Sequence, residues 1–168
     1  MQKIAVVGTG YVGLITAACF ADVGHDVVCI DSDVEKNEAL RKNRSPIYEA
    51  GLEDLIYKNS DHLRFTTSIP EGLDGREAIF ISVGTPMRPD GHADLSFVMR
   101  VAADIGHNLP GGTPLIVIKS TVPPGCNAQI NAVITENLPH DREFSIAFCP
   151  EFCAKVAPSK MCLRLTGS

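Results

Sequence analysis

The stretch Lys3-Ile-Ala-Val-Val-Gly-Thr-Gly-Tyr-Val-Gly13 places a Gly-x-Gly-x-x-Gly pattern between an apolar run and a helical one. Gly8 suits a tight turn, Gly10 lets the backbone approach a pyrophosphate, and Gly13 lets the first helix pack closely on the strand. The amino end of that helix offers unpaired N–H groups to phosphate. Glycine-rich turns also arise for steric reasons alone, but the flanking strand and helix favour a dinucleotide-binding turn.

Asp31 stands at the carboxyl end of the strand predicted over residues 26–30. It follows Gly8 by close to the roughly 20 residues that separate such a turn from the carboxylate that binds an adenosine ribose. A carboxylate there repels the 2′-phosphate of NADP, so the pattern favours NAD as the cofactor. Alternatives stay open at both positions: Asp31 can be a solvated acid at a strand end, and Lys36 can reach the same ribose or be a surface lysine.

Short apolar runs alternate with amphipathic segments along the rest of the chain, which is typical of a parallel sheet with helices on both faces. The predicted fold is therefore α/β, of Rossmann type, with a doubly wound and mostly parallel sheet. A length of 168 residues with 45% hydrophobic content suffices for one such domain. The expected helices span residues 11–23, 34–42, 51–59, 95–109 and 123–137, and the expected later strands span 26–30, 63–67, 78–83, 115–119 and 144–149.

Composition excludes several classes of partner and site. The net charge is −5 and the 15 basic residues are scattered, so neither nucleic acid nor an anionic membrane is an expected partner. The chain shows no membrane-spanning run and no basic leader of a signal peptide, so we expect a cytoplasmic protein. The cysteines form no Cys-x-x-Cys pair and have no neighbouring histidine couple, so no metal site is expected.

Ligands of open parallel sheets bind outside the carboxyl ends of the strands, so the polar residues there are candidate site residues. Thr85 follows one predicted strand, and it either hydrogen-bonds a bound nucleotide or shapes its turn. Thr121 follows the next strand, where it orients a water, binds the cofactor or caps the following helix. Glu151 follows the last strand, where it is placed to act as a general base near a nicotinamide unless it is a solvated loop acid.

Several short motifs occur in order along the chain. They are Lys3 to Gly13, Gly24-His25, Asp31 with Lys36, Pro46-Ile-Tyr-Glu-Ala-Gly51, Val83-Gly-Thr-Pro86, Asp90-Gly-His-Ala-Asp-Leu-Ser96, Lys119-Ser-Thr-Val-Pro-Pro-Gly125 and Pro150-Glu-Phe152. Together they resemble the amino-terminal NAD-binding domain of the UDP-glucose/GDP-mannose dehydrogenase family, and within it the UDP-glucose 6-dehydrogenases. The resemblance covers residues 1–152, which we expect to form the NAD-binding Rossmann domain, and fades in a divergent tail over residues 153–168.

The resemblance implies an enzyme that oxidises the C6 alcohol of a nucleotide sugar to a carboxylate and reduces two NAD per turnover. In such enzymes a cysteine of the carboxyl-terminal domain traps the aldehyde, and the resulting thioester is hydrolysed. Glu151 and Thr121 correspond to catalytic residues of the family. The family's cofactor contacts correspond to Gly8, Gly10, Val12, Gly13, Asp31, Lys36, Thr85 and Thr121.

The end of the chain departs from the family pattern. The family reads Asn-Pro-Glu-Phe-Leu-Arg-Glu-Gly where this chain reads Cys149-Pro-Glu-Phe-Cys-Ala-Lys-Val156. Lys155 thus replaces a glutamate that contacts cofactor and substrate, which puts a positive charge in place of a negative one. The substrate domain and the nucleophilic cysteine of the family have no counterpart in the 168 residues.

Two interpretations of different class follow. In the first, the chain is the NAD-binding half of a UDP-glucose 6-dehydrogenase, truncated and inactive alone, which binds a nucleotide sugar only if a substrate domain is supplied. GDP-mannose and UDP-N-acetylmannosamine are alternative substrates. The resemblance implies dimerisation largely through a central helix that these residues lack, so self-association as a homodimer is expected from the apolar surface that this helix would cover. In the second, the chain is a stand-alone NAD-binding or interaction module without chemistry of its own.

Overall fold

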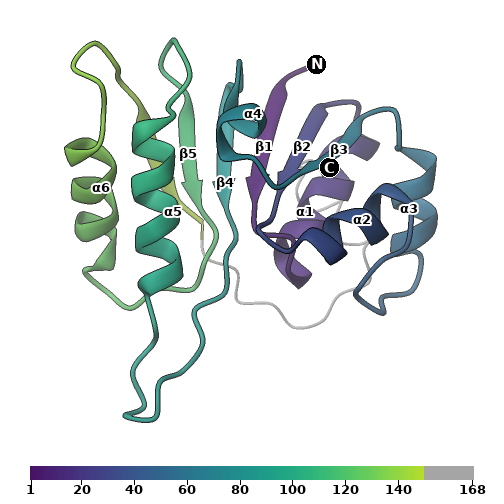
Figure 1. Ribbon diagram of the computed structural model, residues 1–168, viewed down its shortest axis with the longest axis horizontal. Helices are drawn as coiled ribbons and strands as arrows, with labels where there is room; N and C mark the ends of the chain where they lie inside the picture. Colours follow the sequence, from purple (N-terminus) through teal and green to yellow (C-terminus); the bar gives the residue numbers. More distant parts are fainter. Residues whose placement is uncertain (150–168) are drawn as a thin grey trace.

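A parallel six-stranded sheet forms the centre of the protein, and the computed structural model describes residues 1–149 of the chain (Figure 1). The strand order is β3-β2-β1-β4-β5-β6, so the chain builds outward from β1 in one direction and, from β4 onward, in the other. This is a doubly wound order, and the predicted Rossmann-type fold class is confirmed. The strands are β1 (Lys3–Val7), β2 (Asp26–Ile30), β3 (Leu63–Thr66), β4 (Ala78–Ile81), β5 (Leu115–Ile118) and β6 (Ser145–Phe148).

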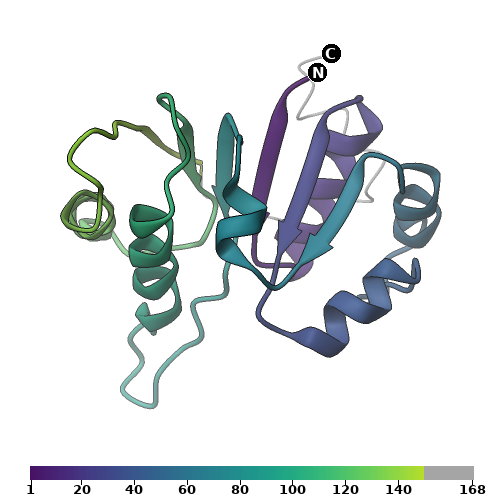
Figure 2. The same ribbon diagram turned by 45° about the horizontal axis from the view of Figure 1, so that its top comes forward.

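Helices cover both faces of the sheet (Figures 1 and 2). The first three pack on one face and the other three on the opposite face. None of the helices within residues 1–149 is long and apolar enough to cross a membrane. They are α1 (Tyr11–Asp22), α2 (Val34–Arg41), α3 (Leu52–Lys58), α4 (Ile69–Leu73), α5 (Ser96–His107) and α6 (Cys126–Glu136).

The central strands supply side chains to two separate cores. In β1, Ile4 and Val6 join the core beneath α1 to α3, whereas Ala5 and Val7 join the core beneath α4 to α6. Because successive strand residues point to opposite faces and both faces are covered, the strand must be apolar throughout. This requirement explains the unbroken apolar run that precedes the glycines.

The expected elements agree with the structure to within a few residues at each end, with two exceptions. Helix α4 was not predicted because it is only five residues long and carries Pro70 in its first turn, although the Ser68 hydroxyl accepts a hydrogen bond from the Glu71 N–H as a cap. The alternative that Thr121 caps the next helix is wrong. That helix begins at Cys126, after Gly125, whose φ is +87°.

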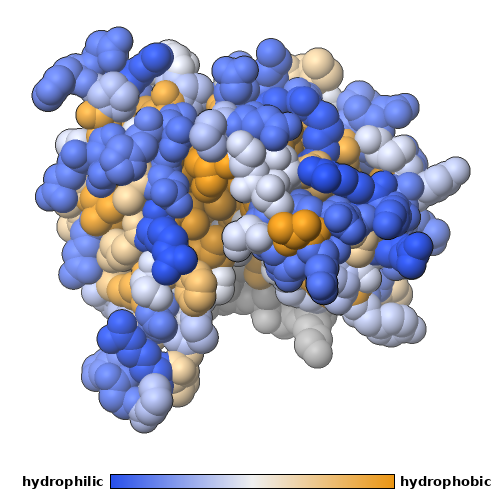
Figure 3. Space-filling model, in the orientation of Figure 1, coloured by the Kyte–Doolittle hydropathy of each residue, from blue (hydrophilic) through white to orange (hydrophobic). Residues whose placement is uncertain are grey.

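The segment between β4 and α5 forms a hairpin that projects beyond the carboxyl ends of the strands, at the lower left of Figure 3. An isolated antiparallel bridge pairs Met87 with Ala93. The Arg88 N–H donates to the His92 carbonyl at 2.8 Å, and the Arg88 guanidinium contacts Asp94 at 3.4 Å. Internal bonds therefore order the hairpin, which leads directly into α5.

An ion-pair network lies at the opposite, amino-terminal edge of the sheet. Asp26, the first residue of β2, accepts from the Arg76 guanidinium at 2.9 Å and from the Arg64 guanidinium at 3.2 Å. The Arg76 side chain is only 6% exposed, whereas that of Arg64 is 60% exposed. Burial opposes ionisation of Asp26, but the hydrogen bonds from Arg76 and Arg64 outweigh it, so the pKa of this carboxyl lies below its usual value.

Candidate functional site

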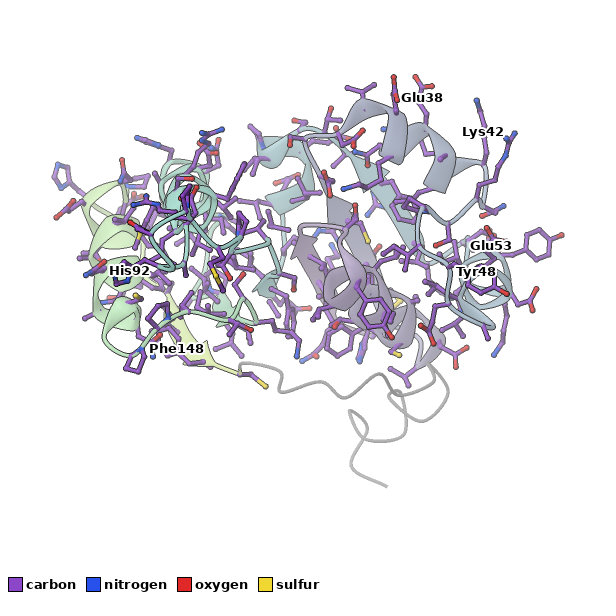
Figure 4. All side chains as sticks on the ribbon, turned by 90° about the horizontal axis from the view of Figure 1, so that it is seen from below. Glu38, Lys42, Tyr48, Glu53, His92 and Phe148 are labelled. Atoms are coloured by element: carbon purple, nitrogen blue, oxygen red, sulfur yellow. The ribbon has the colours of Figure 1, made fainter. Side chains whose placement is uncertain are left out.

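A cleft of about 530 Å³ opens at the carboxyl ends of the strands, where β1 and β4 lie side by side. Chains that leave neighbouring strands in opposite directions make room for a ligand at this point. Figure 4 views this edge of the molecule from below, with His92 on the hairpin and Phe148 at the end of β6 labelled. The cleft is lined by the glycine turn and by segments that follow β2, β3 and β4, including part of α5.

Two of the glycines allow the turn to pack against the end of β4. Gly8 has a φ of +96° and donates its N–H to the Ile30 carbonyl at 2.8 Å, and a Cβ on it would lie 2.8 Å from the Ser82 carbonyl oxygen. A Cβ on Gly13 would collide with the Gly8 carbonyl oxygen and approach the Ser82 side chain to 3.1 Å. The tight turn predicted at Gly8 and the close packing predicted at Gly13 are therefore confirmed.

Gly10 has a different environment. Its φ of −70° is ordinary for any residue, and a Cβ built on it would meet nothing within 4 Å. It precedes the first turn of α1, where no described side chain caps the helix. Open space and the positive end of a helix dipole at one point suit a pyrophosphate, which fits the predicted role of this glycine.

Asp31 lines the cleft and is held by several donors. Its Oδ2 atom accepts from the Thr9 N–H at 2.8 Å, from the Thr9 hydroxyl at 2.6 Å and from the Lys36 ammonium at 2.9 Å. The Asp33 N–H donates to Oδ1 at 3.1 Å. Asp31 is thus a fixed acid within the turn between β2 and α2, and Lys36 is its ion-pair partner.

The electrostatics of this acid follow from those contacts. Burial disfavours the charged form of Asp31, but the hydrogen bonds from Thr9 and Lys36 outweigh it, and the pKa lies below the usual aspartate value. The carboxylate is therefore ionised at neutral pH. Within residues 1–149, no group of three or more His, Cys, Asp or Glu side chains is placed to hold a metal ion.

Thr85 and Thr121 meet across the loops that follow β4 and β5. The Thr85 hydroxyl donates to the Thr121 carbonyl oxygen at 2.8 Å, and the buried Ser120 hydroxyl donates to the Val83 carbonyl oxygen at 2.7 Å. Thr85 therefore joins the two loops, which supports the alternative that it shapes the turn. A hydrogen bond from either threonine to a nucleotide remains a prediction.

The predicted site residues divide into three groups. Gly8, Gly10, Asp31 and Lys36 line the cleft together, whereas Val12, Gly13, Thr85 and Thr121 flank it without lining it. Glu151, together with Cys153 and Lys155, lies outside the described residues. The geometry thus supports the predicted adenosine and pyrophosphate end of a cofactor site and leaves the catalytic end untested.

Several lining residues were not anticipated. Phe97 and Arg100 of α5 face the cleft, with the Arg100 guanidinium carbon 5.8 Å from the Phe97 ring centroid. Ser82, at the end of β4, also lines the cleft, and its buried hydroxyl has no partner within the described part of the chain. Ser82 stands next to the predicted strand-end motif, whereas the orientation of α5 could not be read from its sequence.

Comparison with known proteins agrees with this geometry. The chain is 46% identical to the UDP-glucose 6-dehydrogenase YwqF of Bacillus subtilis over 153 residues, which is 90% of this chain and 34% of that protein. Among solved structures, a UDP-glucose dehydrogenase from Pyrobaculum islandicum superposes with a TM-score of 0.89 at 38% identity, covering 95% of this chain and 38% of the other. A GDP-mannose dehydrogenase from Pseudomonas aeruginosa superposes with a TM-score of 0.84 at 29% identity, covering 92% and 37%.

The chain spans a little over a third of the length of these relatives. Residues 2–163 match the profile described as "UDP-glucose/GDP-mannose dehydrogenase family, NAD binding domain". The match covers nearly the whole chain, and it names the cofactor that the cleft and Asp31 suit. The chain therefore belongs to the UDP-glucose/GDP-mannose dehydrogenase family, in which it forms the NAD-binding domain.

Proposed function

We propose that this chain is the NAD-binding half of a nucleotide-sugar dehydrogenase that oxidises the C6 alcohol of UDP-glucose to UDP-glucuronate with two NAD. The observation that carries the proposal is the pairing of an open, glycine-lined helix start with the fixed carboxylate of Asp31 in one cleft. UDP-glucose is favoured over GDP-mannose because identity is higher to the proteins named for the former. UDP-N-acetylmannosamine remains a further alternative substrate.

Different residues of the cleft bind different parts of NAD in this proposal. The start of α1 at Gly10 offers its N–H groups to the pyrophosphate, and Asp31 accepts hydrogen bonds from the adenosine ribose. When bound, NAD supplies the hydride acceptor for the oxidation. The Thr85 and Ser120 hydrogen bonds join the loops that follow β4 and β5, beside the cleft. There we assign Thr121 to orient a water and Glu151 to act as general base, in an NAD-binding domain that ends near residue 152.

The first expected result concerns the choice between NAD and NADP. The ionised Asp31 repels a 2′-phosphate, an effect of about 1–3 kcal/mol, so the wild-type chain should bind NAD about tenfold or more tightly than NADP. Asp31→Ala should remove most of this preference. Calorimetric titration of both proteins with both cofactors measures the four affinities.

The matched control is Glu35→Ala, which removes the same charge from an exposed position in the first turn of α2. It should keep the wild-type preference because Glu35 does not line the cleft. Equal affinity of the wild type for NAD and NADP would show that Asp31 does not read the ribose. The 2′-phosphate takes up one proton at about pH 6, so the preference should weaken there. Because the pKa of Asp31 is lowered, the remaining preference should persist to below the ordinary aspartate pKa of about 3.9.

A second expected result is that the 168-residue chain by itself forms no NADH from UDP-glucose and excess NAD. Trapping the aldehyde needs an activated thiol held against the sugar, and the sugar must be oriented by binding energy. By resemblance, the other half of the longer relatives provides both. NADH absorbance measures the rate. Turnover that Cys153→Ser abolishes and Cys149→Ser leaves intact would show that the short chain carries its own nucleophile.

The rival proposal is a stand-alone NAD-binding or interaction module, which Lys155 favours because it replaces the expected glutamate. NADH formation after addition of a substrate domain from a relative would separate the two proposals, since a module without chemistry stays inactive. The first proposal also includes a cytoplasmic location and self-association as a homodimer. Sedimentation that shows only monomer at high concentration would contradict the latter.

A further inference from the structure

Behind Asp31, and outside the residues that line the cleft, lies a buried polar side chain. Asn37 of α2 is 1% exposed, and its Nδ2 atom donates to the Asp31 carbonyl oxygen at 2.7 Å and to the Asp33 carbonyl oxygen at 2.9 Å. Because both neighbours are carbonyl oxygens, only the NH2 of the amide can face them. Asn37 therefore ties the turn between β2 and α2 to the body of the helix.

The other hydrogen bonds of Asp31 show what the bond from Asn37 contributes to its position. The Asp31 N–H donates to the Thr66 carbonyl of β3 at 3.1 Å, and the carboxylate is held by Thr9 and Lys36. Asn37 holds the remaining polar group of this residue, its carbonyl. Fixing the peptide on both sides leaves the Cα–Cβ bond of Asp31 little freedom, so the carboxylate is already oriented before a ribose arrives.

The side chain of Asn37 contributes its N–H donors, and filling space does not require an asparagine at this position. Its Oδ1 atom is buried and has no partner among the described residues, an arrangement that costs free energy. A leucine of similar volume would fill the same space without an unpaired oxygen. The amide is thus poorly explained as packing and well explained by the two carbonyl groups that it holds.

We propose that Asn37 is a positioning residue that sets the discrimination between NAD and NADP, because it fixes the turn that carries Asp31. The proposal rests on the proposed function of Asp31 as the acid that reads the adenosine ribose. Asn37 itself touches no ligand. It holds the Asp31 carboxylate where that group accepts a hydrogen bond from the 2′-hydroxyl of NAD and repels the 2′-phosphate of NADP.

The test is Asn37→Leu, titrated with NAD and with NADP. The loss of one oriented hydrogen bond at the Asp31 carbonyl should lower the ratio of the two affinities by about fivefold. The melting temperature should fall by a modest amount, because the Asp31 and Asp33 carbonyls lose the Nδ2 donor while the unpaired Oδ1 is removed as well. A residue that is merely structural would shift the melting temperature and leave the affinity ratio unchanged.

Asn59 is the matched control, a buried asparagine whose Nδ2 donates to the carbonyl of Leu55, four residues before it, and to Asp22. Asn59→Leu removes similar bonds away from the cleft and should keep the wild-type ratio. Should Asn37→Leu fail to fold, Asn37→Ala provides the same comparison in a helix-favouring residue.

The outcomes separate the inference from its premise. If the wild type prefers NAD and Asn37→Leu has the same ratio of NAD to NADP affinity, the proposed role of Asn37 is wrong and that of Asp31 stands. A wild type that binds both cofactors equally would overturn both. A fall in the ratio confined to the Asn37 variants supports the proposal.

Discussion

Gly10→Ala should leave the fold intact and weaken NAD binding by more than about tenfold, whereas Gly13→Ala should lose both the fold's stability and the cofactor. At Gly10 the backbone is ordinary and the space is open, so a methyl group costs the protein little beyond a weaker helix start. We propose that a pyrophosphate approaches through that space, so the methyl group should block the ligand. At Gly13 the methyl group collides with the Gly8 carbonyl, and we expect a loss of about 3 kcal/mol in unfolding free energy.

Thermal unfolding and calorimetric titration with NAD, carried out on both variants, measure the two effects separately. Gly10→Ala serves as the control for Gly13→Ala, because each substitution adds one methyl group to the same turn. Wild-type NAD affinity in Gly10→Ala would mean that the pyrophosphate does not approach the start of α1. Wild-type stability in Gly13→Ala would mean that the helix can move away from the Gly8 carbonyl without cost.

Asp26→Ala is the second change with a large expected effect, and it acts on stability alone. Removing this carboxylate leaves the buried Arg76 guanidinium without its ion-pair partner, which should cost about 2–3 kcal/mol of unfolding free energy. Asp26→Ala leaves Arg76 its 3.4 Å bond from Nη1 to the main-chain carbonyl at position 26, while its Nε atom has no partner within residues 1–149. NAD affinity should stay near the wild-type value, because Asp26 lies at the opposite end of β2 from the cleft.

Arg64→Ala is the matched control, since it removes the exposed partner of the same carboxylate and should cost less than about 1 kcal/mol. Urea unfolding of the three proteins measures these differences. The folded-state pKa of Asp26 is lowered, so its contribution is fully present above the unfolded value of about 3.9 and is lost as pH falls through the folded value. A similar loss in Asp26→Ala and Arg64→Ala would show that burial of Arg76 does not matter.

Most of the fold could be predicted from the sequence because the pattern is simple where both faces of a sheet are buried. The run from Ile4 to Val7 is apolar at every position, as a strand between two cores requires. Helix α4 escaped prediction because five residues are too few to show a helical period. The start of α6 was misplaced because Thr121 and the prolines suggest a cap, whereas the chain turns at Gly125.

The site was predictable where function depends on the backbone or on spacing along the chain. The glycines and Asp31 can be identified in the sequence by their positions relative to the strand ends. The partners of Asp31 do not, because a buried amide such as Asn37 looks like any polar helix residue until its two carbonyl acceptors are seen. Likewise, Arg100 of α5 lies far from Asp31 in sequence, and only the sheet order brings both to one cleft.

The packing of the glycine turn on the end of β4 also has a consequence for the stage of folding at which the turn is completed. β2 begins at Asp26, close to β1 in the sequence, whereas the other neighbour of β1, β4, begins only at Ala78. Contacts between distant segments form late, since their loop-closure entropy is larger. Gly8 and Gly13 both pack on Ser82 at the end of β4, so the turn reaches its final shape only when the two halves of the sheet join. A nascent chain that contains only β1 to β3 thus has the complete glycine motif, but its turn lacks the contacts with Ser82 that fix its final conformation.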